Sequence, residues 1–255
     1  MRKRNSIALA GAVAFVAIAY GDTSAQTHLD VHATVVDSND KPIADVSVSS
    51  DQDPRYGSGR VWLTKTGIDG GFTLEKTGEM IRFLKSGYEP LAVAAGGKPV
   101  PLKFVLQAAK DDFVLQRCAE TLSGQQTFGP PELRFSSDRK TFQKARGNSD
   151  IDYTQFTLRP KGSKVGLELW FGAMALDFMP SDDALMKSEK YSMRNVTRPD
   201  GALVGVDATG VIAGKRWRNF SVVMQGARYS DATDEQAKLF DAVIESACGA
   251  RPEQK

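Results

Sequence analysis

Histidine and cysteine are scarce in this sequence, which contains two of each. With histidine limited to His28 and His32, a serine–histidine–aspartate site would have to reach from the start of the chain, and no Gly-x-Ser-x-Gly elbow accompanies it. A phosphate-binding Walker loop and a dinucleotide-binding glycine fingerprint are both missing. The sequence therefore shows no self-sufficient catalytic motif and implies no cofactor.

The two cysteines, Cys118 and Cys248, both lie in the second half of the chain. An even pair in an oxidising compartment predicts a disulfide, which here would close a loop of roughly 130 residues. Two buried thiols or a metal pair are the alternatives, but two sulfurs with no third ligand nearby make a poor zinc site. We expect a Cys118–Cys248 bridge and no metal.

Residues 1–25 have the pattern of a secretory signal peptide. Basic residues at positions 2–4 precede an apolar run, Ile7–Ala19, and the small residues Thr23 and Ala25 suit signal peptidase. The run is shorter than a membrane-spanning helix needs, although an uncleaved anchor is the alternative. No later stretch is apolar enough to span a membrane, so we expect an exported protein, periplasmic or extracellular, that begins near Gln26.

The charge balance argues against nucleic acid as a partner. The whole chain carries a formal charge of +2, and loss of the basic leader brings the mature protein close to neutral. A neutral surface gains little affinity from the release of counterions around phosphates.

Residues 27–107 are predicted to form a β-sandwich. Leu29, Val31, Ala33 and Val35 alternate with polar residues, as in a half-buried strand. Short strands separated by turn residues every ~8–12 positions are typical of a sandwich or barrel. The other strands are expected at 46–48, 61–64, 72–74, 80–84, 91–94 and 102–106, with a tight turn at Asp69-Gly70-Gly71.

Four segments in this half, in order, resemble the carboxypeptidase regulatory-like domain. They are Val35-Val36-Asp37, Lys41–Val48, Thr66–Leu74 and Lys85–Pro90. The resemblance implies a transthyretin-like (prealbumin-like) Greek-key β-sandwich that serves as a folding or interaction module, with no catalytic residues to carry over. Gly67 departs from the family, which often has an acidic or small polar residue there, and this weakens any inherited metal site.

Residues 111–255 are predicted to form an α+β domain of unknown function, closed by the disulfide. The C-terminal helix has the clearest signals: Thr233 as N-cap, Gln236 three residues later, an apolar face that includes Phe240, and Gly249 as a stop. Pro160–Ser163 and Pro199–Gly201 are predicted hairpin turns. A helix is expected at 113–122, and strands at 133–135, 153–158, 165–173, 191–196, 203–206 and 217–224.

Several short patterns suggest chemistry but are better explained structurally. His28, Asp30 and His32 share one strand face and could chelate a metal, yet this is the solvent face of an edge-like strand. Asp37, Asn39 and Asp40 form a turn and not a calcium loop, because Lys41 takes a ligand position. Ser137-x-x-Lys140 and Lys65-Thr66-Gly67 match elements of a serine acyl-enzyme set in reversed order, and Asp182-Asp183 reads as a solvated loop.

Two aromatic–basic clusters remain as candidate binding residues. One is Arg216-Trp217-Arg218, where strand alternation places the tryptophan on the opposite face from the arginines. The other is Arg55, Tyr56 and Trp62, around a polar loop. Tryptophan, tyrosine and arginine are favoured at binding hot spots, whereas a strand tryptophan in the core is the alternative.

The sequence favours a non-enzymatic binding protein, whose partner is a protein, peptide or glycan of the envelope or exterior. An envelope hydrolase of peptide or glycan, with catalytic carboxylates in residues 111–255, is the alternative. A passive envelope component is the third possibility. Two acidic groups that meet in a cleft would favour the hydrolase, and an open patch of aromatic and basic side chains would favour the binder.

Overall fold

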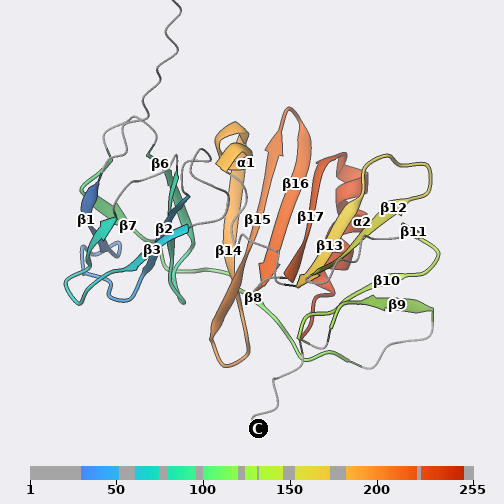
Figure 1. Cartoon of the computed structure of the whole chain (residues 1–255), viewed down its shortest axis with the longest axis horizontal. Helices are drawn as coiled ribbons and strands as arrows, with labels where there is room; N and C mark the ends of the chain where they lie inside the picture. The colour runs from blue at the N-terminus through green and yellow to red at the C-terminus, as the bar shows by residue number, and fades with distance from the viewer. Residues whose placement is uncertain are drawn as a thin grey trace, which may run out of the picture.

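The chain folds mainly into β-strands and ends in a helix. The computed structural model, shown in Figure 1, describes residues 30–51, 61–74, 80–95, 100–119, 124–130, 132–145, 153–172, 182–222 and 225–249. The predicted signal peptide, residues 1–25, lies outside the described residues, as does His28. Among the helices of the described part, none is long and apolar enough to cross a membrane.

The N-terminal unit is a β-sandwich, as predicted. One sheet has the order β4-β1-β7 and the other β3-β2-β5-β6. In β1 the buried side chains of Val31, Ala33 and Val35 alternate with the exposed His32 and Thr34. The two sheets enclose one apolar core, which includes three packed phenylalanine rings. The strands are β1 (Val31–Val36), β2 (Ser47–Asp51), β3 (Val61–Lys65), β4 (Gly71–Leu74), β5 (Met80–Leu84), β6 (Leu91–Ala94) and β7 (Lys103–Val105).

The predicted turn at Asp69-Gly70 is present, but it does not close a hairpin. Gly70 has a φ of 73°, and the Gly71 N–H donates to Asp69 Oδ1 at 2.9 Å. A side chain at Gly70 would meet the Val35 carbonyl oxygen at 2.4 Å, so glycine is required on both counts. Because β3 pairs with β2 and β4 pairs with β1, the turn carries the chain from one sheet to the other.

The second unit is built on an eight-stranded sheet with the order β11-β12-β13-β17-β16-β15-β14-β8. Its neighbouring strands are antiparallel, except that the short edge strand β8 runs parallel to β14. Both predicted hairpin turns are present, with Gly162 and Gly201 at positive φ. The elements are β8 (Phe113–Val114), β9 (Gln125–Phe128), β10 (Phe135–Asp138), β11 (Phe142–Ala145), β12 (Tyr153–Pro160), β13 (Leu167–Gly172), α1 (Asp182–Lys187), β14 (Lys190–Thr197), β15 (Leu203–Ile212), β16 (Lys215–Val222), β17 (Gln225–Ala232) and α2 (Asp234–Glu245).

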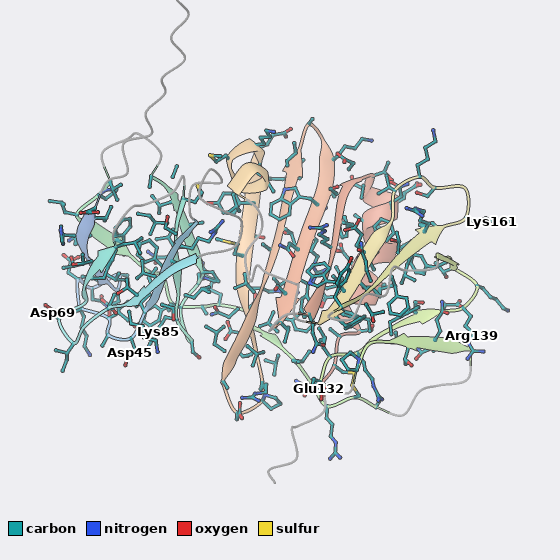
Figure 2. The ribbon with its side chains drawn as sticks, viewed as in Figure 1. Asp45, Asp69, Lys85, Glu132, Arg139 and Lys161 are labelled. Atoms are coloured by element: carbon teal, nitrogen blue, oxygen red, sulfur yellow. A yellow bond between two sulfur atoms is a disulfide. The ribbon has the colours of Figure 1, made fainter. Side chains whose placement is uncertain are left out.

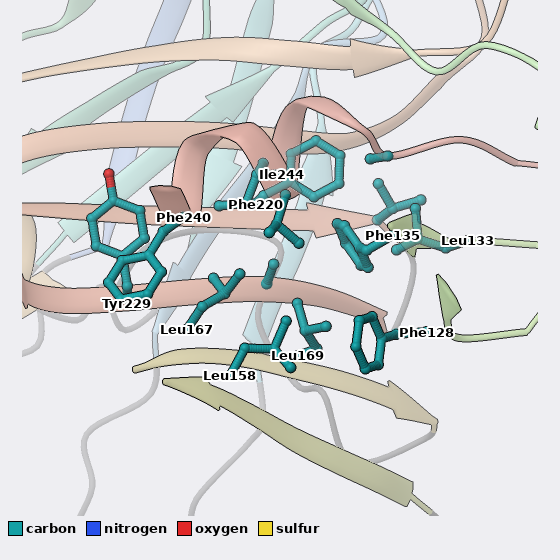
Figure 3. Close-up of a cluster of buried hydrophobic side chains, with 14 of the residues drawn as sticks. Phe128, Leu133, Phe135, Leu158, Leu167, Leu169, Phe220, Tyr229, Phe240 and Ile244 are labelled. Carbon is teal, nitrogen blue, oxygen red and sulfur yellow. The ribbon is translucent and has the colours of Figure 1, made fainter. Parts of the chain in front are cut away.

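Helix α2 covers one face of this sheet and begins as predicted. Thr233 and Gln236 form a reciprocal capping box, which satisfies two N–H groups of the first turn. Figure 3 shows Phe240 and Ile244 pointing from α2 into a cluster with Leu167 and Phe220 of the sheet. The helix ends at Glu245 with Ser246 as C-cap, earlier than the predicted stop at Gly249.

The helix predicted at 113–122 is wrong over its described part, residues 113–119. Phe113 and Val114 form β8, and the Leu115 N–H donates to the Thr197 carbonyl oxygen at 2.7 Å. The Gln116 carbonyl oxygen accepts from Gly249 at 2.9 Å, and Cys118 is held by its disulfide. Backbone pairing to two separate elements therefore overrides the helical spacing of the apolar residues.

The two units share buried apolar surface. Met80 and Ala92 of the sandwich form one buried cluster with Leu185 of α1, Ala208 of β15 and Trp217 of β16. Hydrogen bonds also cross the boundary: Asn195 Nδ2 donates to the Tyr88 carbonyl oxygen at 2.6 Å, and Ser86 Oγ donates to that of Gly201 at 2.9 Å. The sandwich is therefore packed against the second unit through a buried apolar cluster and at least two hydrogen bonds.

The predicted disulfide is confirmed. Cys118 and Cys248 are bridged, with their Cα atoms 4.8 Å apart and 130 positions apart in sequence. Cys248 also pairs through its backbone with Arg134, so the bridge joins the start of the unit, the residue before β10 and the segment after α2.

We expect replacement of both cysteines by alanine to lower the free energy of unfolding by about 2–4 kcal/mol, since the cross-link restricts the unfolded chain. Urea denaturation followed by circular dichroism would measure this loss. Reductant should destabilise the wild type by a similar amount and leave the double variant unchanged. A double variant as stable as the oxidised wild type would contradict the prediction.

Candidate binding groove beside the disulfide

Trp217, predicted as a partly exposed binding residue, is buried, so this expectation is wrong. Its ring is 4% exposed and belongs to the cluster between the two units. The indole Nε1 donates to Ser188 Oγ at 2.8 Å, which satisfies its one donor. Gly210 on β15 makes room for the ring, because a side chain there would lie 2.6 Å from the indole. The tryptophan is a packing residue.

Arg218 is also buried and cannot contact a ligand directly. As predicted from strand alternation, it lies on the opposite face of the sheet from Trp217, where it contacts α2. Arg216 is partly exposed, and its guanidinium lies 3.6 Å from the Asp234 carboxylate at the start of α2. This cluster therefore provides one accessible arginine and no aromatic surface.

The other predicted binding residues remain predictions. Arg55 and Tyr56 lie outside the described residues, and Trp62 lies in β3 with its side chain outside them.

The weaker candidates take ordinary structural roles where they are described. His32 contacts Thr73 Oγ1 at 3.0 Å, and Asp37 accepts backbone N–H groups within its own turn. Thr66 Oγ1 donates to the Ile43 carbonyl oxygen at 2.7 Å. Ser137 is buried on β10. Asp182 and Asp183 begin α1, not a loop, and their side chains lie outside the described residues.

Arg218 is the centre of an ionic network between the sheet and α2. Its guanidinium donates to both carboxylate oxygens of Asp207 at 2.8 and 2.7 Å, to Asp241 at 3.0 Å and to Glu245 at 2.6 Å. Burial alone would lower the pKa of Arg218, but the bonds and charge of Asp207, followed by Glu245 and Asp241, outweigh it and raise the pKa. The guanidinium stays charged at every accessible pH.

Tyr229, a buried residue of β17, also belongs to this network. Its hydroxyl donates to Asp241 Oδ1 at 2.9 Å. Burial, followed by the negative charge of Asp241, raises the pKa of Tyr229 above its ordinary range. The hydroxyl therefore remains a donor to Asp241 throughout the neutral range.

Arg194 carries the network outward to a groove. Its Nε donates to Asp207 at 2.9 Å, and its Nη2 donates to Glu245 at 3.0 Å. The guanidinium lies over the Phe113 ring, 5.0 Å from the centroid, in a cation–π contact. Arg194 and Glu245 both line the groove, so its inner wall is fixed by the buried charges behind it.

The groove has a volume of about 600 Å³ and, besides Arg194 of β14, is lined by three segments. One wall is the extended segment 112–119, the second is the β9–β10 hairpin, and the third is the end of α2 with residues 245–248. Figure 2 places Glu132, in the β9–β10 connection, near the bottom of the second unit, and Arg139 at the opposite end of that hairpin. The disulfide itself forms part of the lining.

The hairpin presents a polar face to the groove because its residues alternate. Phe128 and Phe135 are buried in the core, whereas their neighbours Thr127 and Ser136 line the groove. The Ser136 N–H donates to Ser246 Oγ at 2.8 Å, which fixes the hairpin to the end of α2.

Two more arginines line the groove, Arg117 and Arg134. Unlike Arg194 and Arg218, neither has a carboxylate partner among the described residues. Asp112, a further acid in the lining, accepts from Asn195 Nδ2 at 3.3 Å. The groove therefore offers two guanidinium groups whose charge the described part of the chain leaves unmatched.

Apart from the predicted disulfide between Cys118 and Cys248, sequence reasoning identified no residue of this groove. Arg117 and Arg134 are far apart in sequence from Arg194. The immediate neighbours of each of the three arginines are uncharged, so none of them belongs to a basic cluster in the sequence. One signal for this site was present in the sequence. The predicted disulfide brings Cys248 next to Cys118, and therefore next to Arg117.

Metal ligands do not cluster in the described part of the chain: no three side chains of the histidine, cysteine, aspartate or glutamate type come together there.

Comparison of the chain with protein-family models, curated proteins and solved structures finds no match.

Proposed function

We propose that this protein is an exported, non-enzymatic binding protein that takes a carboxylate-bearing ligand in the groove beside the disulfide. The observation that carries this proposal is the pair Arg117 and Arg134, two residues that line the groove and have no carboxylate partner in the described chain. Guanidinium groups bind carboxylates bidentately, and such charge-assisted bonds are stronger than neutral ones.

Export is supported by two features. The first is the signal-peptide pattern of residues 1–25. The second is the disulfide, because such bridges persist in oxidising compartments and are rare in the cytosol. The place of action we propose is the periplasm or the exterior.

The hydrolase alternative finds less support in the described part of the second unit. Asp112 and Glu245 both line the groove, but each already accepts a hydrogen bond, Asp112 from Asn195 and Glu245 from Arg194 and Arg218. Asp207 and Asp241 also accept from Arg218. The side chain of Asp207 is 1% exposed, so it cannot meet a substrate. Carboxylates bound to a shared arginine serve structure better than proton transfer.

The N-terminal sandwich has a supporting role in this proposal. Its resemblance to the carboxypeptidase regulatory-like domain implies an accessory module, and its buried contact with α1 and β16 fits a scaffold. A passive envelope component would need no groove with unmatched charge.

A second aromatic–basic pair offers less to a ligand. Arg228 lies over the Trp170 ring, 5.6 Å from the centroid, and its Nε donates to Glu168 at 2.7 Å. Its charge is already matched, so this pair gives no electrostatic reason for an anionic ligand.

The proposal can be tested with two fluorescent acidic probes of different backbone, hexaglutamate and an oligogalacturonate, and with hexalysine as the charge control. We expect at least one acidic probe to bind, and the Arg117→Gln/Arg134→Gln double variant to weaken it at least tenfold, since charged hydrogen bonds contribute about 1.5–3 kcal/mol each. Fluorescence anisotropy at low salt would measure this.

Arg159→Gln is the matched control, because it removes one exposed arginine of β12 outside the groove. It lies near Lys161, which Figure 2 shows at the far tip of the β12–β13 hairpin. Equal binding of the acidic probes to the wild type and the double variant would contradict the proposal, as would tighter binding of hexalysine.

A further inference from the structure

We infer that the groove binds an extended acidic peptide, which pairs through its backbone with the open edge of β8. This inference rests on the proposed function and adds the class of ligand and its mode of binding. The structural basis is the unpaired backbone of Val114 on the outer edge of β8, beside two unmatched arginines. Two residues further along the chain, the same edge is already paired by the bridge between Gln116 and Cys248.

Strand β8 is the last strand of the large sheet, and its outer edge is open at Val114. The Leu115 N–H points to β14, where it donates to Thr197, whereas the Gln116 carbonyl points the other way, to Gly249. Since successive residues of a strand direct their backbone groups to opposite sides, the Val114 N–H and C=O point away from β14. Within the described chain, β14 is the one strand that pairs with β8.

The open edge faces the groove. Val114 lines it together with Gln116 and Arg117, and its side chain is 41% exposed. An edge strand with free N–H and C=O groups is a template for an added strand, and an extended peptide can supply the missing pairing. In Figure 1 the β9–β10 hairpin lies at the lower right of the second unit, and its residues line the same groove as Val114.

The lining favours a peptide over a glycan. Sugar rings are bound largely by stacking on exposed aromatic faces. The two aromatic residues of the groove, Phe113 and Phe135, are 7% and 0% exposed, so neither offers a face to a sugar. The Arg194 guanidinium also covers the Phe113 ring.

Charge complementarity makes the peptide acidic. Arg117 precedes Cys118 of the disulfide on one wall, and Arg134, the residue before β10, pairs with Cys248 through its backbone. The hairpin wall also contributes the uncharged Gln125, Thr127 and Ser136, so an extended chain could place acidic side chains toward the arginines and amides toward these polar residues. A basic peptide would meet two like charges at these positions.

The test compares hexaglutamate with the same peptide N-methylated at alternate residues, which keeps the charge and removes half of the backbone N–H groups. An oligogalacturonate serves as the acidic non-peptide probe. We expect hexaglutamate to bind most tightly of the three probes. N-methylation in the register that faces β8 should raise the Kd of the peptide about tenfold, which corresponds to about 1.4 kcal/mol. Both methylation registers are made, and one should bind much more weakly than the other.

Amide exchange gives a second readout that does not depend on a variant. In NMR of the oxidised protein, the Val114 N–H should exchange more slowly when hexaglutamate is bound, and the exchange rate of the Leu115 N–H, which already donates to Thr197, should change less. Hexalysine should change neither.

The outcomes separate this inference from the proposed function. Binding of the oligogalacturonate alone, lost in Arg117→Gln/Arg134→Gln, would overturn the peptide and retain the carboxylate groove. Equal binding of both N-methylated registers, with Val114 exchange unchanged, would overturn the strand pairing. Failure of every acidic probe would overturn both.

Discussion

Replacement of Arg218 by methionine is expected to lower the free energy of unfolding by about 3–5 kcal/mol, the cost of removing one member of a buried ion pair. Arg218 is 4% exposed and donates to both oxygens of Asp207, which is itself 1% exposed. Methionine would fill much of the space but could not donate to Asp207. Arg194, which also reaches Asp207, would be left to neutralise it alone.

The double variant Arg218→Met/Asp207→Asn separates charge from packing. Because it removes both members of the buried pair, we expect it to recover at least about 1 kcal/mol relative to the single variant in a double-mutant cycle. Arg159→Met, at an exposed position of β12, should change stability by no more than about 0.5 kcal/mol. Urea denaturation would measure all three, and a loss below about 1 kcal/mol for Arg218→Met would contradict the prediction.

Replacement of Trp217 by alanine is expected to cost about 3–5 kcal/mol, because it opens a cavity where the two units meet. The ring packs with Met80 and Ala92 of the sandwich and with Leu185 of α1. Its loss also leaves the Ser188 hydroxyl without the indole donor. We further expect the two units to unfold at different urea concentrations in this variant, since their shared apolar contact is weakened.

Trp217→Phe is the matched control, as it keeps an aromatic ring and removes the indole N–H. It should cost less than the alanine variant and keep a single transition. Circular dichroism and thermal unfolding would follow both variants. If Trp217→Ala lost less than about 1 kcal/mol, the ring would not hold the units together.

The sequence predicted those features whose cause is local. The alternation in Val31–Val35 and the Asp69-Gly70 turn are set by side-chain period and by backbone freedom at glycine. The capping box of Thr233 and Gln236 is likewise a contact between close neighbours, and it is found as predicted. The disulfide was predicted from the expected oxidising compartment and the count of cysteines, and neither needs knowledge of the fold.

The binding residues could not be predicted in the same way, because exposure is a property of the packed molecule. Trp217 and Arg218 have the composition of a hot spot, yet the sandwich and α1 cover one, and Asp207 with α2 encloses the other. Segment 113–119 has helical spacing, but Thr197 and Gly249 supply backbone partners that an isolated helix would not have.

By itself the sequence determined the secondary-structure signals, the two-unit organisation we expected and the cysteine pair, since these depend on neighbours along the chain. Only the tertiary structure decided which charges are matched. Arg218 and Arg194 meet carboxylates from β15 and α2, while Arg117 and Arg134 face an open groove without one in the described chain. Charge pairing over such sequence distances depends on how the sheet, hairpin and helix pack, and that packing also leaves the edge of β8 open.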